Sequence, residues 1–404
     1  MIRLLTFTTL YPNAVTPSHG VFVQTRLRHL VASGEVESRV IAPVPWFPFR
    51  HRLFGNYAKY AAVPANEHLL GLKVQHPRYL LLPKIGMNSA PSFLVKTGLA
   101  AARRLIAAGY DFDLIDAHYF YPDGVAAVTI GRALNKPVVI TARGTDINLI
   151  PQYPVPRRMI LDAARDCAAI ITVCNALRDE LVTLGADVKK ITPLRNGVDL
   201  ELFHREDRAA ARHAYGVGGD RFVIVSVGLL IERKGHELVI EALQGIPDAE
   251  LLIAGSGPNE TELRALAVRK GVAGRVRFLG ALPQEQLRTL YNAADCLVLA
   301  SSREGWANVL LEAMACGTPV VASNVWGTPE VVATSAAGVL MDARTTPAIV
   351  RAVTRLRNAL PERSATRAYA EQFNWDATSE GQIAVFRHVL APDMIAVGSP
   401  SCAI

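Results

Sequence analysis

One stretch, residues 296–323, constrains the fold of this chain more than any other. An apolar run at 296–300 has the length of a buried strand, and a second run at 320–323 has the same character. Between the two runs, apolar residues recur at helical spacing from about Asn308 onwards. A strand, a helix and another strand in this order form one unit of a parallel sheet. Such sheets bind ligands at the carboxyl ends of their strands.

Two carboxylates with seven residues between them lie in this unit. Glu304 falls in the loop that leaves the first strand, where Gly305 lets the backbone come close to a ligand, and Glu312 falls one turn into the helix. The N–H groups at the helix start suit a phosphate, and Glu312 can accept hydrogen bonds from two neighbouring hydroxyls. The pattern fits a sugar joined through a diphosphate to a ribose. Two surface glutamates on an ordinary βαβ unit would show the same spacing.

The length of the chain predicts two domains. Its 404 residues exceed one ordinary core, and strand-like runs alternate with helical segments through both halves, which indicates an α/β fold with doubly wound parallel sheets. No apolar run approaches the ~18 residues that a membrane-spanning helix needs. The five cysteines have no metal-binding or redox spacing, so we expect buried thiols in a reducing cytoplasm.

Positive charge is concentrated near the N-terminus. Residues 1–110 carry 13 Lys and Arg against 3 Asp and Glu, whereas the rest of the chain carries 30 against 33. This imbalance predicts an anionic partner. Nucleic acid is disfavoured because no zinc pattern, RNA-binding signature or basic dimer helix is present. The segment 45–60 mixes aromatic and basic residues, which suits a membrane interface or, equally, aromatic packing under the domain.

Polar residues follow several predicted strands of the first half. A strand at 2–10 leads through a loop to Gly20 at the start of a helix, an arrangement in which a phosphate can approach the helix start. The loop lacks the dinucleotide-binding fingerprint GxGxxG. The strand 113–118 ends at His118. The next strand ends before Arg143, so both side chains should face one cleft. A guanidinium at 143 can hold an acidic sugar or a phosphate, with Asp146 to orient it.

The second half repeats this pattern. A strand at 222–228 ends at Gly228, and the loop after it carries Arg233 and Lys234, where a cation pair would meet a diphosphate. The next strand ends in a turn with Gly255 and Gly257, which permit close backbone approach. Alternatively, the two basic residues lie in a solvated loop and bind no ligand.

The segment EGWANVLLEAMACGTPVV resembles the E-x7-E motif of the family 4 glycosyltransferases, which are retaining enzymes with the GT-B fold. RNGVD at 195–199 resembles the family's interdomain crossing, and Lys234 matches its K-G pair. The chain departs at Trp306-Ala307, where Phe-Gly is common, and at ARGTD (142–146), where many relatives have HG-x-D. HYFYPDG and TARGTDI look most like bacterial members that build surface polysaccharides.

The resemblance implies two facing Rossmann-like domains with a deep cleft between them. It assigns catalysis to His118, Glu304, Arg233 and Lys234. Donor binding falls to Gly20, Gly228, Gly255, Gly257, Gly305, Trp306, Ala307, Asn308, Val309 and Glu312. The acceptor or sugar side falls to Arg143, Asp146 and Asn196. The predicted divisions are an acceptor-side domain at 1–200, a nucleotide-sugar domain at 201–375, a helix crossing back at 376–392 and a flexible tail at 393–404.

The predicted activity is transfer of a sugar from a nucleotide-diphosphate sugar, UDP favoured over GDP, to a hydroxyl of a lipid-linked or glycan acceptor. Neither a metal nor a cofactor is expected, and an anionic membrane surface is a further candidate partner, at the inner face of the cytoplasmic membrane. A glycosidase pair is rejected because nothing in the sequence keeps one glutamate protonated. The rivals are a nucleotide-sugar 2-epimerase of the same fold and a non-catalytic subunit that binds nucleotide sugar or membrane.

Overall fold

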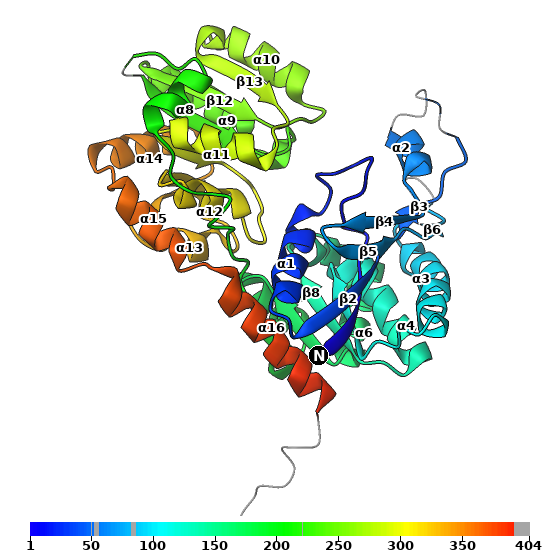
Figure 1. Cartoon of the computed structure of the whole chain (residues 1–404). Helices are drawn as coiled ribbons and strands as arrows, with labels where there is room; N and C mark the ends of the chain where they lie inside the picture. Colours follow the sequence, from blue (N-terminus) through cyan, green and yellow to red (C-terminus); the bar gives the residue numbers. More distant parts are fainter. Residues whose placement is uncertain (50, 52–55, 82–85, 220, 392–404) are drawn as a thin grey trace, which may run out of the picture. The chain divides into compact units, whose positions relative to one another are not determined.

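The computed structural model describes residues 1–49, 51, 56–81, 86–219 and 221–391. The chain forms two compact units: Met1–Leu194 together with the segment from Asp376 onwards, and Arg195–Trp375. We call them unit 1 and unit 2. Each is a parallel sheet wrapped by helices, so the predicted pair of Rossmann-like α/β domains is confirmed (Figure 1). The predicted tail at 393–404 lies outside the described residues.

Unit 1 contains an eight-stranded sheet in the order β10-β9-β8-β7-β1-β2-β5-β4. All neighbouring pairs are parallel except the hairpin β4–β5. Its strands are β1 (Ile2–Phe7), β2 (Val36–Ile41), β4 (Asn66–Leu69), β5 (Leu72–Gln75), β7 (Leu114–His118), β8 (Val138–Ala142), β9 (Ala169–Thr172) and β10 (Ile191–Pro193). The helices are α1 (Val21–Ala32), α2 (Asn56–Ala62), α3 (Ala90–Ala107), α4 (Val125–Leu134), α5 (Thr145–Asn148), α6 (Pro154–Asp166), α7 (Asn175–Leu184) and α16 (Trp375–Leu390). Two short strands, β3 (Val44–Pro45) and β6 (Arg78–Tyr79), form a separate ladder.

Unit 2 contains a six-stranded parallel sheet in the order β13-β12-β11-β14-β15-β16. Its strands are β11 (Phe222–Val227), β12 (Ala249–Ala254), β13 (Val276–Gly280), β14 (Cys296–Leu299), β15 (Val320–Ser323) and β16 (Gly338–Met341). Its helices are α8 (Arg208–Ala214), α9 (His236–Ala242), α10 (Glu260–Arg269), α11 (Gln284–Ala293), α12 (Asn308–Ala315), α13 (Thr328–Val331), α14 (Thr346–Asn358) and α15 (Arg363–Glu371).

Each sheet has one point at which the strand order reverses. In unit 1, β1 leads to β2 on one side and β7 leads to β8 on the other; in unit 2, β11 and β14 diverge in the same way. Loops that leave the carboxyl ends of such a strand pair separate and leave a crevice, which is where open α/β sheets bind ligands. The predicted site residues lie at or after the ends of β1, β7, β8, β11, β12 and β14, except Asn196, which follows β10.

The last helix that the structure describes, α16, returns to unit 1 (Figure 1). Its Ile383 and Phe386 are buried in the apolar cluster that contains Leu4, Leu27 and Val40. Burial of one such large apolar side chain contributes about 1.5–3 kcal/mol to stability. The chain therefore crosses between the units twice, after Leu194 and at the start of α16.

The apolar pattern predicts a helix that starts near Asn308 and a strand at 320–323, and α12 and β15 confirm both. The predicted helix at 376–392 corresponds to α16, which spans Trp375–Leu390. The prediction did not include the β4–β5 hairpin, the β3–β6 ladder, the edge strand β16 or the helices α2, α5, α6 and α8. Apart from α6, these elements are only two to seven residues long, which is too short for a clear periodic pattern of apolar residues.

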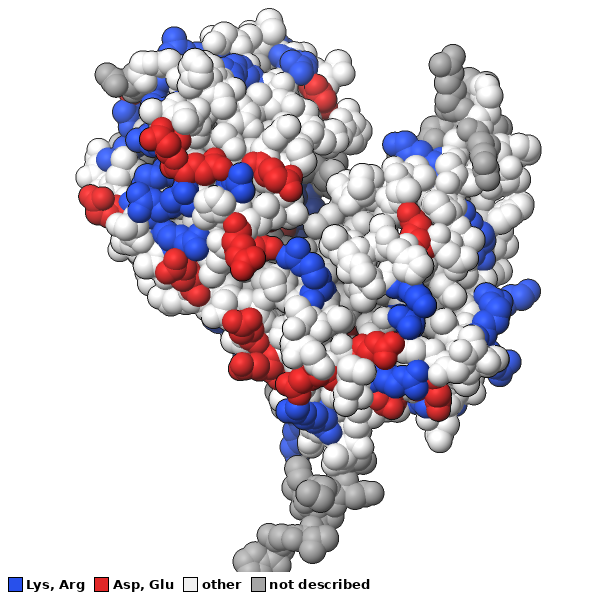
Figure 2. All heavy atoms as spheres, in the orientation of Figure 1, with Lys and Arg blue, Asp and Glu red and all other residues white. Residues whose placement is uncertain are grey.

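The aromatic and basic segment 45–60 is described only in part. Trp46 and Phe49 expose 52% and 55% of their surface, and Leu80, one position beyond the ladder partner of β3, exposes 40%. Each of these three residues therefore leaves about half of its surface exposed, and the Phe49 ring packs edge-on against Phe47. Figure 2 shows Lys and Arg spread over the visible face of unit 1 rather than gathered into one patch.

Candidate functional site

The candidate site of unit 2 lies where β11 and β14 end beside each other. The strands are paired with Ile224 opposite Cys296. The loop after β11 forms a short turn, Glu232–Lys234, before α9, and the loop after β14 carries Glu304. The two loops are joined by a backbone hydrogen bond of 2.8 Å from Ser302 N to the carbonyl of Arg233. The predicted cations and the predicted carboxylate are therefore held at one edge of the sheet.

Glu304 is the centre of a buried charge cluster. Its side chain lies 2.6 Å from Lys234 Nζ and 3.5 Å from an Arg233 guanidinium nitrogen, and only 8% of the residue is exposed. Burial raises the pKa of this carboxyl, but Lys234 and Arg233 outweigh it, so the pKa of Glu304 lies below its usual value. Arg233 also donates to the carbonyl of Arg303 over 2.8 Å, which fixes its guanidinium. An ionised carboxylate thus holds two cations in place.

Glu312 has the opposite electrostatic character. It lies on the first turns of α12, and burial raises its pKa to about 7, although the hydroxyl of Tyr291 donates to its Oε2 over 3.0 Å. The sequence-based argument that nothing keeps one of the two glutamates protonated was therefore wrong. The cause is tertiary: α11 places the buried Tyr291 beside the half-buried Glu312, whose neighbours Leu311 and Ala313 on α12 are buried.

The helix start of α12 has the character expected of a phosphate site. Ala307 precedes the helix without a capping side chain, and the buried residues Gly305 and Trp306 come before it. Val309 is half-buried. Trp306 replaces the smaller aromatic residue common in the family; its ring packs on Phe373 at 6.0 Å and lies 5.8 Å from the Arg195 guanidinium carbon.

Asn196 lies in unit 2, although the sequence prediction grouped it with Arg143 and Asp146 on the acceptor side. Its amide nitrogen donates to the side-chain oxygen of Asn308 over 3.2 Å. The next residues are held by unit 2 as well, since Val198 N donates to the carbonyl of Phe373 over 2.8 Å. Asn196 therefore buttresses the start of α12.

Two of the predicted donor-binding glycines are required by contacts between loops. A Cβ on Gly255 would lie 1.8 Å from the carbonyl oxygen of Gly228, and one on Gly257 would lie 2.4 Å from that of Leu230. The turn after β12 thus packs directly against the loop after β11. Gly255 also has φ 149°, which disfavours any side chain. The backbone that comes close to these two glycines is therefore that of the neighbouring loop, at Gly228 and Leu230.

In unit 1, the loop after β1 ends at Gly20, which begins α1 with φ 70°. A Cβ there would lie 2.3 Å from the carbonyl of Leu10, so the loop folds back onto its own start. The same loop is anchored by Asp123, whose carboxylate accepts from the backbone N–H and the hydroxyl of Thr9 at 2.8 and 3.0 Å. Gly20 is therefore held at the carboxyl edge of the sheet.

His118 and Arg143 lie together, as expected of adjacent strand ends. His118 pairs with Thr141 in the β7–β8 register, and its Nδ1 lies 2.6 Å from an Arg143 guanidinium nitrogen. His118 Nε2 lies 3.0 Å from Asp116 Oδ2. Burial lowers the pKa of His118, so the imidazole is neutral at pH 7.

Asp146 orients Arg143 through the backbone. Its carboxylate accepts hydrogen bonds from the N–H groups of Arg143, Gly144 and Phe120 at 2.7–3.1 Å. These contacts fix the loop after β8 and tie it to the loop after β7. The Arg143 guanidinium lies over the Phe22 ring, 5.6 Å from its centre.

Sequence reasoning missed several buried polar residues beside these sites. His236 at the start of α9 lies 2.9 Å from Ser226 Oγ, and burial lowers its pKa to about 4. Arg26, Asp116 and Gln382 form a buried chain next to His118. A polar residue inside an apolar helix or strand is the only signal of such a network in the sequence, and it does not identify the partner.

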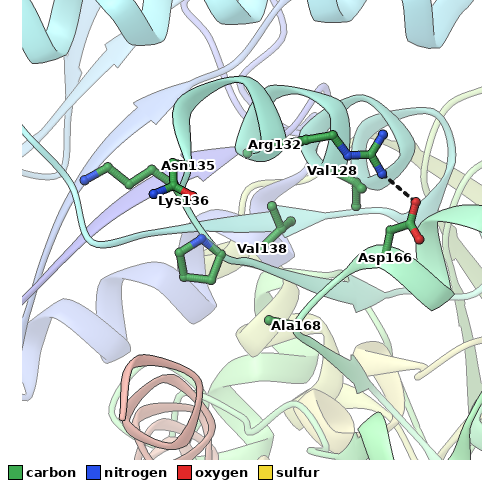
Figure 3. Close-up of a pocket in the computed structure, with 9 residues that line it drawn as sticks. Val128, Arg132, Asn135, Lys136, Val138, Asp166 and Ala168 are labelled. Carbon is green, nitrogen blue, oxygen red and sulfur yellow. Dashed lines mark hydrogen bonds and ion pairs between the residues drawn. The ribbon is translucent and has the colours of Figure 1, made fainter. Parts of the chain in front are cut away.

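The structure also contains hollows away from the predicted residues. One of about 460 Å³ lies at the amino end of β8 and is lined by Arg132, Asn135, Lys136 and Asp166 among others (Figure 3). Its Arg132–Asp166 ion pair is exposed. Among the described residues, no cluster of three metal-ligating side chains occurs, and no helix has the length and apolarity to cross a membrane.

Two protein-family models match consecutive parts of the chain. The model of glycosyltransferase family 4 matches residues 20–202, and the model of glycosyl transferases group 1 matches residues 207–373. A chain of Bacillus subtilis named for a glycosyltransferase of teichuronic acid biosynthesis, TuaC, is 28% identical over 331 residues, which is 81% of this chain and 82% of the relative. The D-inositol 3-phosphate glycosyltransferase of Mycobacteroides abscessus is 35% identical over 221 residues, which is 53% of this chain but 50% of that relative.

Solved structures share the same architecture. The sucrose-phosphate synthase of Thermosynechococcus elongatus has a TM-score of 0.78 at 20% identity and covers 97% of this chain and 100% of its own. HepE of Anabaena, in complex with UDP, has a TM-score of 0.73 at 20% identity and covers 96% of this chain and 100% of its own. At this identity the likeness establishes the fold, which is that of the GT-B glycosyltransferases.

Proposed function

Because this chain belongs to the family 4 glycosyltransferases, we propose that it transfers a sugar from a nucleotide-diphosphate sugar to a hydroxyl group of a lipid-linked or polysaccharide acceptor. The anomeric configuration of the sugar is kept. The product belongs to a cell-surface or exported polysaccharide, and the likeness to the Bacillus subtilis protein supports this assignment.

The observation that carries the proposal is the cluster of Glu304, Lys234 and Arg233 at the β11–β14 reversal point. When the bond between the sugar and the diphosphate breaks, negative charge grows on the departing phosphate. Cations fixed in a poorly hydrated site stabilise that charge without having to reorganise. Glu304 keeps both cations in position before the donor arrives, and the α12 helix start adds N–H groups.

We assign the remaining part of the donor to Glu312. Glu312 accepts hydrogen bonds from the ribose hydroxyls, one turn beyond the phosphate site. Structures of the same fold have been solved with UDP, with UDP-glucose and, for the starch synthase IV of Arabidopsis thaliana, with ADP. We propose a UDP-sugar as the donor of this chain, in preference to a GDP-sugar.

Unit 1 supplies the acceptor side in this proposal. His118, Arg143 and Gly20 follow strands that end at one edge of its sheet, and Asp146 fixes the loop between them. The exposed Trp46, Phe49 and Leu80 lie in the part of the chain that carries the excess of positive charge. Exposed rings in a segment whose sequence also carries basic residues favour the surface of an anionic bilayer. We therefore place the protein at the inner face of the cytoplasmic membrane.

Thermal unfolding with nucleotides tests the donor site. UDP, GDP, ADP and CMP are added separately to the unmodified protein, to Glu312→Ala, and to Glu262→Ala, which removes an exposed glutamate of α10 as a matched control. A nucleotide at about a hundred times its Kd adds roughly 2.7 kcal/mol, which raises the melting temperature by several degrees. We expect UDP to shift the protein and the control, but not Glu312→Ala. If no nucleotide shifts the unmodified protein, the donor assignment fails.

Product analysis then tests the reaction. The matching UDP-sugars are incubated with lipid-linked acceptors, and proton NMR of the product reports the anomeric configuration. A glycosylated acceptor with the donor's configuration is expected. An epimerised free nucleotide sugar would instead identify a 2-epimerase, and nucleotide binding without turnover on any acceptor would favour a non-catalytic subunit.

A further inference from the structure

A buried chain of polar side chains connects the last helix to the end of β8. Arg26 Nε donates to Gln382 Oε1 over 2.7 Å, and Gln382 Nε2 donates to Asp116 Oδ2 over 3.1 Å. The same Asp116 oxygen lies 3.0 Å from His118 Nε2, and His118 Nδ1 lies 2.6 Å from the Arg143 guanidinium. All five residues are at least nine-tenths buried.

The chemistry of the neighbours fixes the proton on His118. A guanidinium only donates hydrogen bonds, so Nδ1 must accept from Arg143. A neutral imidazole with an unprotonated Nδ1 carries its proton on Nε2, which lies 3.0 Å from the carboxylate oxygen Oδ2 of Asp116. The acceptor nitrogen of the imidazole is therefore used inside the protein.

Gln382 fits its place in the same way. Its amide accepts from Arg26 at one end and donates to Asp116 at the other, which neither a glutamate nor a lysine can do. It reaches this place from α16, which returns to unit 1 after the second crossing. Arg26 also donates to the carbonyl of Leu194, the last residue before the first crossing, over 3.1 Å.

Exposure distinguishes His118 from Arg143, the last residue of this polar network. His118 exposes 1% of its surface and Arg143 8%, and Arg143 follows the strand end at the carboxyl edge of the sheet. We propose that His118 is a positioning residue for Arg143, that Asp116 and Gln382 fix the imidazole, and that the Arg143 guanidinium is the group presented to the substrate. The inference rests on the proposed transferase function. It reverses the role that the family resemblance gives to His118.

A pair of substitutions separates the two nitrogens of His118. In His118→Asn the side-chain oxygen lies near the position of Nδ1 and still accepts from Arg143, whereas in His118→Gln the amide lies near Nε2 and reaches only Asp116. If His118 acts by holding Arg143, His118→Asn keeps most of kcat. We expect His118→Gln and Arg143→Ala each to lower kcat by on the order of 10- to 100-fold, as for the loss of one hydrogen bond to a charged group.

A double-mutant cycle tests whether His118 acts through Arg143. In the Arg143→Ala background, His118→Gln should cause no further loss of kcat, because the residue that it positions is gone. The melting shift with UDP should stay unchanged in every variant, since none of them changes the Glu304 cluster or Glu312 in unit 2. Multiplying losses, or equal losses in His118→Asn and His118→Gln, would overturn the proposal, because His118 would then act on the substrate itself.

NMR of the protein labelled with 15N-histidine tests the arrangement without any turnover. The signal of His118 is identified by its absence in His118→Gln. At pH 7 we expect Nε2 to be protonated, with an exchange-protected N–H that is lost in Asp116→Ala and weakened in Gln382→Leu. Tyr110→Phe is the control. It removes hydrogen bonds to the carbonyls of Leu4 and Glu37 in the same unit, and neither of these belongs to the network of Arg26, Gln382, Asp116, His118 and Arg143. A proton on Nδ1, or an imidazolium at pH 7, overturns the proposal whether or not the transferase function holds.

Discussion

Substitution of Lys234 by methionine should destabilise the protein strongly at neutral pH. The ammonium group lies 2.6 Å from a carboxylate whose side chain is 9% exposed, and the remaining cation, Arg233, is farther away at 3.5 Å. Removal of one partner of a buried ion pair typically costs about 3–5 kcal/mol, because the other charge stays buried. For a unit of this size, each kcal/mol lowers the melting temperature by about 2–4 °C. A decrease of roughly 10 °C is therefore expected.

The double variant Lys234→Met/Glu304→Gln separates the buried charge from other effects. It removes both charges and should recover most of the loss, because no uncompensated carboxylate remains. Lys270→Met is the matched control in unit 2: Lys270 Nζ lies 2.9 Å from Glu241, but both side chains are about a third exposed. Its loss should not exceed about 1 kcal/mol.

The pH dependence gives an independent readout. The folded state holds the pKa of Glu304 below its usual value, so its stabilising contribution is present above the unfolded pKa and is lost as the pH falls through the folded one. The difference between the unmodified protein and Lys234→Met should therefore shrink on acidification. Melting curves followed by circular dichroism at pH 7.5 and at successively lower pH measure it. Equal melting temperatures of the two proteins at pH 7.5 would refute the reasoning.

Three further predictions concern other parts of the structure. Burial raises the pKa of Glu312 to about 7, so between about pH 4.5 and 7 the folded state binds a proton that the unfolded state does not. The stability that this proton contributes is lost as the pH rises through that range, and in Glu312→Gln the melting temperature should depend less on pH there. Gly255→Ala places a Cβ 1.8 Å from the backbone carbonyl after β11 and should cost about 3 kcal/mol or more in urea unfolding, whereas Gly274→Ala, with open space around it, should cost under about 1 kcal/mol. Gln382→Leu leaves the buried Arg26 without one acceptor and should cost about 1.5–3 kcal/mol, measured as faster hydrogen exchange in α16; unchanged exchange would contradict it.

The sequence predicts the sheet elements of this fold well because buried parallel strands are short, continuous apolar runs. β11 and β14 show this pattern, and the helix start at Asn308 follows from the apolar spacing of α12. The hairpin β4–β5 has no such continuous apolar run: β4 alternates between exposed and half-buried residues, and in β5 the buried Leu72 and Val74 alternate with polar residues. The order of strands in a sheet depends on which apolar faces pack together, and no local pattern records it.

The sequence predicts which charged residues form the site, but it does not predict how their pKa values are shifted. Glu304 and Glu312 have the same side chain and lie eight positions apart, yet the pKa of one is lowered and that of the other is raised to about 7. The difference comes from Lys234, which the β11 loop brings from 70 residues away, and from the lack of any comparable cation beside Glu312 among the groups that govern its pKa. Ionisation depends on such long-range neighbours, which spacing along the chain cannot supply.

Arg143 illustrates the same limit and its consequence for function. In sequence, the change from the HG-x-D pattern of relatives to ARGTD is a single substitution whose meaning is open. In the structure, the guanidinium of Arg143 donates to Nδ1 of His118, and Nε2 lies 3.0 Å from the carboxylate of Asp116. In our proposal, an imidazole whose acceptor nitrogen is engaged by Arg143 positions that residue and does not contact the substrate. The substitution therefore alters the role of a residue that the sequence leaves unchanged, and only the contacts between β7, β8 and α16 reveal it.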